Sequence, residues 1–528
     1  MCQITKYCFF LSIFFPGFLF AQRVSYSSYL NVRSPDIFQV IGKSGDDYWV
    51  AREEIRKINT RHESSLVLAN ERFAVFDNRL HFVKEMPAQR IPGTIKEYLV
   101  NGKSFFDQLV LSAASGKTNV FINRYTAAET ATNSSRLVDS FPFSAPGTRF
   151  LLVRSEDLSK ILLIGFEFRP GQLPRLHTVL FDGGWNILYH QVLEHAYFTQ
   201  PCIQDDFVSF PAENFDNLPV KLANNGEWLM ASASIASLNY LLFHIYDDGK
   251  SFYYQEIPLS PYYTMEDIAM SIDNEHLDMS VGLLSRYRNT SVKNVQVSHF
   301  SMIQNRFDFD SSYQFNSLAG RLRNQNLSNE SFISVPGEGY MLFKEYGRPK
   351  DSQDLFPPDI EPWDPVYLMA TSSGSENDKS QLNQNGYTLK KGLQGIRSLF
   401  NRGNLTMFYF PLRAQDSTWS GIINTEQTTE LNAPYLSYLV FPVKNRVYII
   451  YNSEIRSADE FGTATTLNTN GQPTDDPVIF WKMDRTLDFQ KARRISAEEV
   501  AVPYKNNLQT GFAVIRLVPV NGPPSTVN

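Results

Sequence analysis

The chain has 528 residues, with 49 Lys and Arg against 55 Asp and Glu, and a formal net charge of −6. Its charges are scattered and form no basic run, which argues against a partner bound through a nucleic-acid phosphate backbone. Aromatic residues make up 14% of the chain, an enrichment that favours strands over helices.

Residues 1–21 have the pattern of a secretory signal peptide. Lys6 precedes an apolar run over 7–21, and Pro16 interrupts that run. The run is too short and broken for a membrane span, whereas the small residue at its end suits cleavage before Gln22. An uncleaved anchor is the alternative. No later stretch approaches about eighteen apolar residues, so we expect no membrane span after cleavage.

Cysteine usage points to the compartment. Two of the three cysteines, Cys2 and Cys8, lie in the predicted signal peptide, which leaves Cys202 without a disulfide partner in the exported chain. An exported, disulfide-free and aromatic-rich chain is typical of the periplasm or cell surface of a Gram-negative bacterium, where we expect this protein. A reactive thiolate needs a neighbouring base or cation, and we expect no such role for Cys202.

One hairpin frame recurs along the chain: an apolar residue ends a strand, polar residues turn, and alternating residues begin the next strand. The copies are FDNRLHF (76–82), FDGGWNIL (181–188), YDDGKSFYY (246–254), IQNRFDF (303–309) and MDRTLDF (483–489), with a weaker copy INRYT (122–126). Asp-Gly and Gly-Gly supply the positive φ angles that tight turns need. The turns at Asp77, Asn123, Asp182, Asp247 and Gln304 lie 46, 59, 65 and 57 residues apart.

Short apolar strands precede most of these turns, so each repeat offers about four strands. These strands are YWVAR (48–52), KILLIGFEF (160–168), EWLMASAS (227–234), LDMSVGLL (277–284), GYMLFKEY (339–346) and RVYIIYNS (446–453). Four-stranded antiparallel sheets at this period predict an all-β β-propeller, in which neighbouring sheets stack around a channel. An array of β-sandwiches is the alternative architecture.

We expect seven blades, with six or eight as alternatives, in a single domain over 22–528. The 180 residues between Gln304 and Asp484 would then hold two intervals and a loop-rich insertion at about 347–386. The missing hairpin copy would lie near 405–421.

We expect both ends of the chain to close the ring, because closure removes exposed sheet edges. The strand at 510–520 would pair with the strand at 23–30 or with that at 36–42. No long amphipathic helix is predicted, although residues 104–114 have the pattern of two helical turns.

Two segments carry a resemblance to known repeat families. RSEDLSKILLIG (154–165) resembles the Ser-Pro-Asp-Gly turn and hydrophobic strand of TolB-like bacterial propellers, although the Pro and Gly are missing here. The Gly183–Gly184 pair before Trp185 is similar to a kelch repeat, and no other Gly-Gly pair occurs. The resemblance spans about 36–520 and implies a bacterial exported β-propeller repeat protein, with no specific family assigned.

Well-specified catalytic signatures are missing from the sequence. Gly-Lys-Ser/Thr tripeptides occur at 42–44, 102–104, 116–118 and 249–251. None has the Gly five residues earlier that a phosphate-binding loop needs, so we interpret them as turns. There is no Gly-x-Ser-x-Gly turn and no His-Glu-x-x-His pair. His190 and His195 are interpreted as strand histidines, and we expect no metal and no cofactor.

Carboxylates are the best remaining candidates for chemistry. Asp205 and Asp206 are adjacent, while Asp273 with Glu275 and Asp308 with Asp310 are two residues apart. Residues two apart face the same side of a strand, and paired carboxylates hold calcium or cleave glycosides as acid and base. Their more ordinary role is to solvate hairpin turns, which is the role we expect here.

These observations predict an exported binding or scaffolding module of the bacterial cell envelope rather than an enzyme. A protein or glycan partner would occupy a loop face, and the insertion at 347–386 is a second candidate for partner binding. The alternative is a carbohydrate-active hydrolase or lyase, in which Asp205, Asp273 and Glu275 would converge at the mouth of the ring. The sequence identifies neither the ligand nor a catalytic residue.

Overall fold

The computed structural model consists almost entirely of strands. It describes residues 23–517 apart from 32–36, 60–63, 103–104, 127–134, 144–148, 168, 170–171, 196–219, 235–238, 247, 259–262, 288–292, 315–330, 336–337, 346–399, 403–404, 412–418, 424–426, 430–437, 444–445, 455–459, 469–477, 484–485, 497 and 507–508. The predicted signal peptide, Cys202 and the insertion at 347–386 lie outside the described residues. Within the described ranges, a single 3₁₀ turn, η3 (Phe489–Lys491), accompanies the strands.

The first half of the described chain forms four antiparallel sheets, each of four consecutive strands. Sheet 1 comprises β3 (Ile37–Ser44), β4 (Asp47–Asn59), β5 (Ser64–Phe76) and β6 (Phe82–Pro87). Sheet 2 comprises β7 (Thr94–Asn101), β8 (Phe106–Ala114), β9 (Lys117–Tyr125) and β10 (Arg136–Phe141). Sheet 3 comprises β11 (Arg149–Arg154), β12 (Lys160–Glu167), β13 (Arg175–Asp182) and β14 (Ile187–Glu194). Sheet 4 comprises β15 (Val220–Leu222), β16 (Trp228–Ser234), β17 (Asn239–Tyr246) and β18 (Ser251–Pro258).

Four more sheets follow in the described residues, together with a two-stranded ribbon of β25 (Phe400–Arg402) and β28 (Gln427–Thr429). Sheet 5 comprises β19 (Tyr263–Asp273), β20 (Asp278–Tyr287), β21 (Lys293–Ser301) and β22 (Arg306–Gln314). Sheet 6 comprises β23 (Ser331–Val335), β24 (Gly339–Glu345), β26 (Leu405–Pro411) and β27 (Trp419–Ile423). Sheet 7 comprises β29 (Tyr438–Val443), β30 (Arg446–Glu454), β31 (Glu460–Asn468) and β32 (Val478–Met483). Sheet 8 comprises β33 (Thr486–Leu487), β34 (Arg493–Arg494), β35 (Glu499–Asn506) and β36 (Gln509–Arg516), joined by β1 (Arg23–Tyr26) and β2 (Leu30–Asn31).

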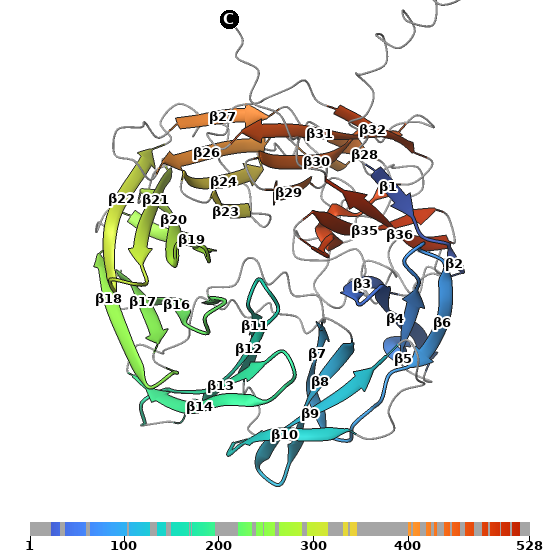
Figure 1. Cartoon of the computed structure of the whole chain (residues 1–528), viewed down its shortest axis with the longest axis horizontal. Coiled ribbons are helices and arrows are strands. Elements are labelled where there is room, and N and C mark those ends of the chain that lie inside the picture. The colour runs from blue at the N-terminus through green and yellow to red at the C-terminus, as the bar shows by residue number, and fades with distance from the viewer. Residues whose placement is uncertain are drawn as a thin grey trace, which may run out of the picture.

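The sheets follow one another around a common centre (Figure 1). The first strand of a sheet lies toward the middle and the fourth at the rim, as β19 and β22 show. This rotational order is that of a β-propeller, as predicted, and not that of a β-sandwich array. The two helical turns expected at 104–114 are wrong, because this segment contains β8.

The expected count of seven blades is not confirmed, because the described strands form eight sheets, one of the two alternatives. The difference in blade number lies in the last third of the chain, where the hairpin turn predicted at 483–489 is wrong. β32 ends at Met483 and β33 begins at Thr486 in the next sheet, so this segment links two sheets. Three sheets therefore follow sheet 5, one more than the seven-blade prediction allows.

The other hairpin copies had mixed outcomes. The frame at 405–421 is confirmed as a hairpin of β26 and β27. The weak copy at 122–126 is wrong, because Asn123 lies within β9, opposite Gln108 on β8. The turns at Asp77 and Asp182 are confirmed, and Asp247 lies outside the described residues.

Each of the six apolar strands predicted before the turns lies in the second strand of its sheet. They belong to β4, β12, β16, β20, β24 and β30. A second strand has paired strands on both edges and a neighbouring sheet on both faces. Its residues alternate between two apolar clusters: Leu162 packs toward sheet 4 and Leu163 toward sheet 2. This explains why these segments read as nearly continuous apolar runs.

The ring is closed by strands from both ends of the chain. β1 pairs with β36 in antiparallel register from Arg23 opposite Arg516 to Tyr26 opposite Ala513. The predicted pairing of 510–520 with 23–30 is therefore confirmed. The alternative partner, 36–42, is wrong, because that segment contains β3, which pairs with β4.

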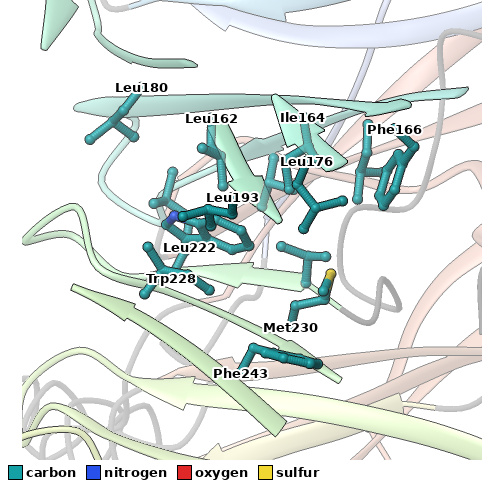
Figure 2. Packing of buried hydrophobic residues seen from close by; sticks show 14 of the residues in the cluster. Leu162, Ile164, Phe166, Leu176, Leu180, Leu193, Leu222, Trp228, Met230 and Phe243 are labelled. Atoms are coloured by element: carbon teal, nitrogen blue, oxygen red, sulfur yellow. The ribbon is translucent and has the colours of Figure 1, made fainter. Parts of the chain in front are cut away.

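Apolar clusters join neighbouring sheets at seven of the eight contacts within the described part of the chain. Figure 2 shows the cluster between sheets 3 and 4, with Leu162, Leu176 and Leu193 on the side of sheet 3 and Trp228, Met230 and Phe243 on the side of sheet 4. Full burial of one such side chain contributes roughly 1.5–3 kcal/mol. The stability of the ring therefore lies between the sheets rather than inside any one of them.

Candidate functional site

On one face of the ring, the turns between first and second strands meet near the axis. The Asn224 backbone N–H donates to Asn274 Oδ1 (2.8 Å), and Asn274 Nδ2 donates to Glu156 Oε2 (3.1 Å). Glu156 Oε1 also lies 3.3 Å from Arg494 Nη1 on β34. Sheets 3 and 8 are not neighbours, so this contact crosses the middle of the ring, toward which the β11–β12 turn reaches (Figure 1). We call these four residues the axial cluster.

The axial cluster is exposed, with 55% of the Glu156 side chain and 40% of the Arg494 side chain open to solvent. Exposed ion pairs contribute about 0–1 kcal/mol, so this contact does not hold the ring together. The hydrogen bonds and the ion pair of the axial cluster connect turns from sheets 3, 4 and 5 with β34. The result is a polar surface of fixed shape at one end of the ring.

Asp273, a predicted site residue, ends β19 beside the axial cluster and is buried. Its Oδ1 accepts hydrogen bonds from the backbone N–H groups of Glu275 (2.9 Å) and His276 (3.2 Å). Its Oδ2 lies 2.8 Å from His276 Nδ1, and this hydrogen bond raises the pKa of the exposed His276. Both oxygens are therefore committed to the β19–β20 turn, which is the structural role that we expected for these acids.

Unlike the other seven contacts, the contact between sheets 5 and 6 is not spanned by an apolar cluster of described residues. Sheet 6 still has buried apolar side chains on the face that carries Tyr340, namely Phe332, Leu342, Phe408 and Phe410. Met279 and Val281 of β20 belong to the cluster with sheet 4. Because side chains alternate along a strand, Asp278 and Ser280 point toward sheet 6 instead. Their cross-strand partners on β21 share that face. The polar seam comprises Asp273, Asp278, Ser280, His299 and Ser301 of sheet 5 and Tyr340 of sheet 6.

The polar seam contains groups that can recognise a hydroxyl-bearing or charged ligand. His299 Nε2 has no hydrogen-bond partner in the described structure and lies 3.6 Å from Asp278 Oδ2, whose side chain is 24% exposed. The His299 ring lies 6.1 Å from that of Tyr340, and burial raises the pKa of this tyrosine. Buried polar groups cost free energy compared with apolar packing, so this group of buried polar side chains marks a candidate functional site.

The seam residues Asp278, His299 and Tyr340 were missed from the sequence, although one signal existed. In LDMSVGLL, Asp278 and Ser280 alternate with Met279 and Val281. A second strand of a propeller sheet has neighbouring sheets on both faces, so this alternation indicates one polar contact.

Among the described residues, the predicted acids do not gather in one place: Asp273 and Glu275 lie at the β19–β20 turn, away from Asp308 and Asp310. Asp205 and Asp206 lie outside the described residues, and Glu275 is exposed in the β19–β20 turn. Asp308 and Asp310 lie on β22, at the rim of sheet 5. Within the described ranges, no three His, Cys, Asp or Glu residues could hold a metal ion.

Histidine–carboxylate pairs were also missed. Of the seven histidines that the structure describes, six lie within 4.0 Å of a carboxylate oxygen: His81, His177, His190, His244, His276 and His299. For His190 the partner is Asp139 on the neighbouring sheet, 3.6 Å away, so sequence spacing could not reveal it. His195 instead packs on the rings of Phe243 and Tyr254.

The histidines of sheet 3 predict that acidification weakens the fold. Burial lowers the pKa values of His177 and His195 below the usual 6.5, and the hydrogen bond to Glu167 only partly offsets this for His177. Below about pH 6.5 these two histidines bind protons in the unfolded chain more readily than in the folded chain. The free energy of unfolding therefore falls as the pH falls. The raised pKa of His276 acts in the opposite direction, but that side chain is exposed and its pairing is screened by solvent. We therefore expect the melting temperature to drop between about pH 7.5 and about pH 5.5.

The variant His195→Phe keeps the ring packing and removes one titration, so its melting temperature should change less with pH. His81→Gln, in an exposed turn, is the matched control and should keep the pH dependence of the parent chain. A parent profile that is flat or rises on acidification would contradict this prediction.

The chain matches no protein-family model and no curated protein. It is similar in structure to the β-propeller domain of the trilobed protease from Pyrococcus furiosus, at 8% identity over 96% of this chain and 99% of that chain, with a TM-score of 0.30. A polysaccharide lyase, Uly1, is 8% identical over 94% of this chain and 100% of that chain, with a TM-score of 0.36. The Nup133 β-propeller domain of Vanderwaltozyma polyspora is 8% identical over 90% of this chain and 100% of that chain, with a TM-score of 0.32. These similarities are too low to say what this chain binds or catalyses.

Among the described residues, no helix has the length and apolar character needed to cross a membrane.

Proposed function

We propose that the chain is an exported β-propeller of eight blades that acts as a binding or scaffolding module of a bacterial cell envelope. The signal-like residues 1–21 and the single cysteine of the remaining chain support export. The polar seam, in which buried polar side chains of sheet 5 face sheet 6, is the observation that supports binding.

Asp273 favours this function over the alternative of a carbohydrate-active hydrolase or lyase. A general acid or base must exchange a proton with the substrate. Both carboxylate oxygens of Asp273 instead form hydrogen bonds within the β19–β20 turn. The nearby Glu156 likewise holds Arg494 and Asn274. These carboxylates position turns, and a surface of positioned turns suits recognition.

The insertion at 347–386 is the second candidate for partner binding. β24 and β26 pair directly, from Gly339 opposite Pro411 to Glu345 opposite Leu405. The chain therefore leaves sheet 6 after Glu345 and returns to it at Leu405, at the same end of two adjacent strands. Removing 347–386 should leave the paired strands in place.

The test combines localisation with binding. In the native bacterium we expect the chain in the envelope or medium, with Gln22 as its first residue. The purified chain is then applied to a glycan array and used to capture envelope proteins. We expect a partner whose affinity falls about tenfold or more in Asp278→Asn, which removes a carboxylate from the polar seam, or is lost on removal of 347–386.

Arg72→Ala, at an exposed ion pair on sheet 1, is the matched control and should bind normally. Each variant must keep the melting temperature of the parent chain within a few degrees. A chain that stays in the cytoplasm would contradict export. Release of shortened glycans, abolished in Asp273→Asn, would favour the hydrolase or lyase.

A further inference from the structure

The rim strand β14 leaves an open edge. It is the last strand of sheet 3, and its outer edge pairs with no described strand. Three large apolar side chains on it are about half exposed: Ile187 (45%), Leu188 (47%) and Val192 (50%). An open edge with exposed apolar side chains is a template for another strand.

Two other rim strands, β6 of sheet 1 and β10 of sheet 2, are better protected against such pairing. β6 carries Lys84 and Glu85, and β10 carries Arg136 and Asp139. From residue 187 to residue 193, β14 has no Asp, Glu, Lys or Arg. Charged residues on an edge discourage strand addition, and β14 lacks them over this stretch.

The residues of β14 complement a second copy of the same strand. Tyr189 and Leu193 face the cluster with sheet 4, so Leu188, His190 and Val192 share the opposite face. An antiparallel pair with its two-fold axis at His190 places Leu188 opposite Val192 of the second copy. Two such apolar cross-strand pairs form by symmetry, and pairs of this kind stabilise a sheet.

The charges at the ends of this pairing are also complementary. In the same register, Glu194 lies opposite Asn186 of the second copy. Arg136 donates from Nη2 to the Gly184 carbonyl oxygen (3.2 Å), so its guanidinium lies beside that turn. Glu194 accepts a hydrogen bond from Arg175 Nε of its own chain (2.8 Å), and in the dimer it would also approach Arg136 of the other copy, on the face that both residues share. No like charges are opposed.

We propose that the chain forms a two-fold dimer by pairing the β14 edges of two rings. Sheet 3 of one ring and sheet 3 of the other then become one continuous eight-stranded sheet, since each contributes four strands. The two rings lie rim to rim. Both turn faces, including the axial cluster, stay free for a ligand.

The test measures molecular mass in solution by sedimentation over a range of concentrations. The purified full chain should change from one copy to two as its concentration rises. Leu188→Lys and Val192→Lys each place a charge at the pairing edge and should weaken the dimer by about tenfold or more. Both side chains are half exposed, so the melting temperature of the monomer should not change.

Two controls make the result specific. Ile303→Lys, at a 70% exposed side chain in the β21–β22 turn, should dimerise like the parent chain. Glu194→Arg should weaken the dimer, and adding Arg136→Glu should restore it. A single-chain mass at every concentration would overturn the proposal, as would a dimer that both Lys variants leave intact.

Discussion

A chain that begins at Val32 is expected to lose most of its stability. It lacks β1 and β2, so β36 becomes an open edge of sheet 8. The four residues of β1 pair with β36, and each ladder hydrogen bond contributes about 0.5–1.5 kcal/mol. Together with the lost packing, the cost should reach roughly 5 kcal/mol, comparable to the whole stability of many domains.

The residues that follow β1 also form hydrogen bonds to both sheet 8 and sheet 1. The Ser27 carbonyl oxygen accepts a hydrogen bond from the Tyr504 hydroxyl (2.9 Å), and Ser27 Oγ accepts one from the Phe512 backbone N–H (2.9 Å). The Ser28 backbone N–H donates to the Leu80 carbonyl oxygen in sheet 1 (2.8 Å). This segment therefore joins the last sheet to the first, and its loss weakens the contact between them.

The measurement is chemical unfolding followed by circular dichroism, with a chain that begins at Gln22 as the reference. The control carries residues 22–31 after Asn528, where they can reach β36 from the other end. This control should recover much of the lost stability, because it restores the strand without the original connection. A truncated chain as stable as the reference would show that the ring does not depend on closure.

The all-β class and the repeat could be predicted from the sequence because their signals are local. Asp77 and Asp182 show the reason: each Oδ1 accepts hydrogen bonds from backbone N–H groups two and four residues later. Such a turn needs a short acceptor at a fixed position, whatever surrounds it. Because this signal is so short, a polar residue inside a strand can also match it. The turn predicted at Asn123 is wrong for this reason.

The count of blades and the site depend on contacts between sheets, which leave little trace in local sequence. The segment 483–489 has the hairpin frame, but only pairing shows that β33 belongs to sheet 8. Asp273 was selected for its distance from Glu275 along the chain. Its significance lies in the polar seam, where Asp278 and His299 join it from neighbouring strands.

Trp228→Ala is expected to cost about 3–5 kcal/mol, the usual range for removing a large aromatic side chain from a core. Trp228 is fully buried between sheets 3 and 4, with Leu222 and Met230 beside it (Figure 2). Its Nε1 donates a hydrogen bond to the Tyr189 hydroxyl (2.9 Å), and apolar side chains of the same cluster surround this pair. The replacement leaves a cavity and removes this hydrogen bond.

Trp228→Phe separates the two effects, because it keeps most of the ring volume and removes the N–H donor. It should cost about 1–3 kcal/mol, the range for leaving a buried polar group unpaired. Val83→Ala, at a half-exposed rim position, is the control and should stay within about 0.5 kcal/mol of the parent chain. Denaturant unfolding supplies all three values, and a Trp228→Ala cost no larger than that of Val83→Ala would contradict the packing between these sheets.

The shape of the unfolding transition tests the ring itself. In an open row of repeats, weakening one contact allows one part to unfold before the rest. In a closed ring every sheet has two neighbours, so opening at one contact exposes both adjoining sheets and removes support from the next. Trp228→Ala should therefore shift one cooperative transition to lower denaturant rather than split it in two. Two separate transitions would show that sheets 3 and 4 divide the ring into independent parts.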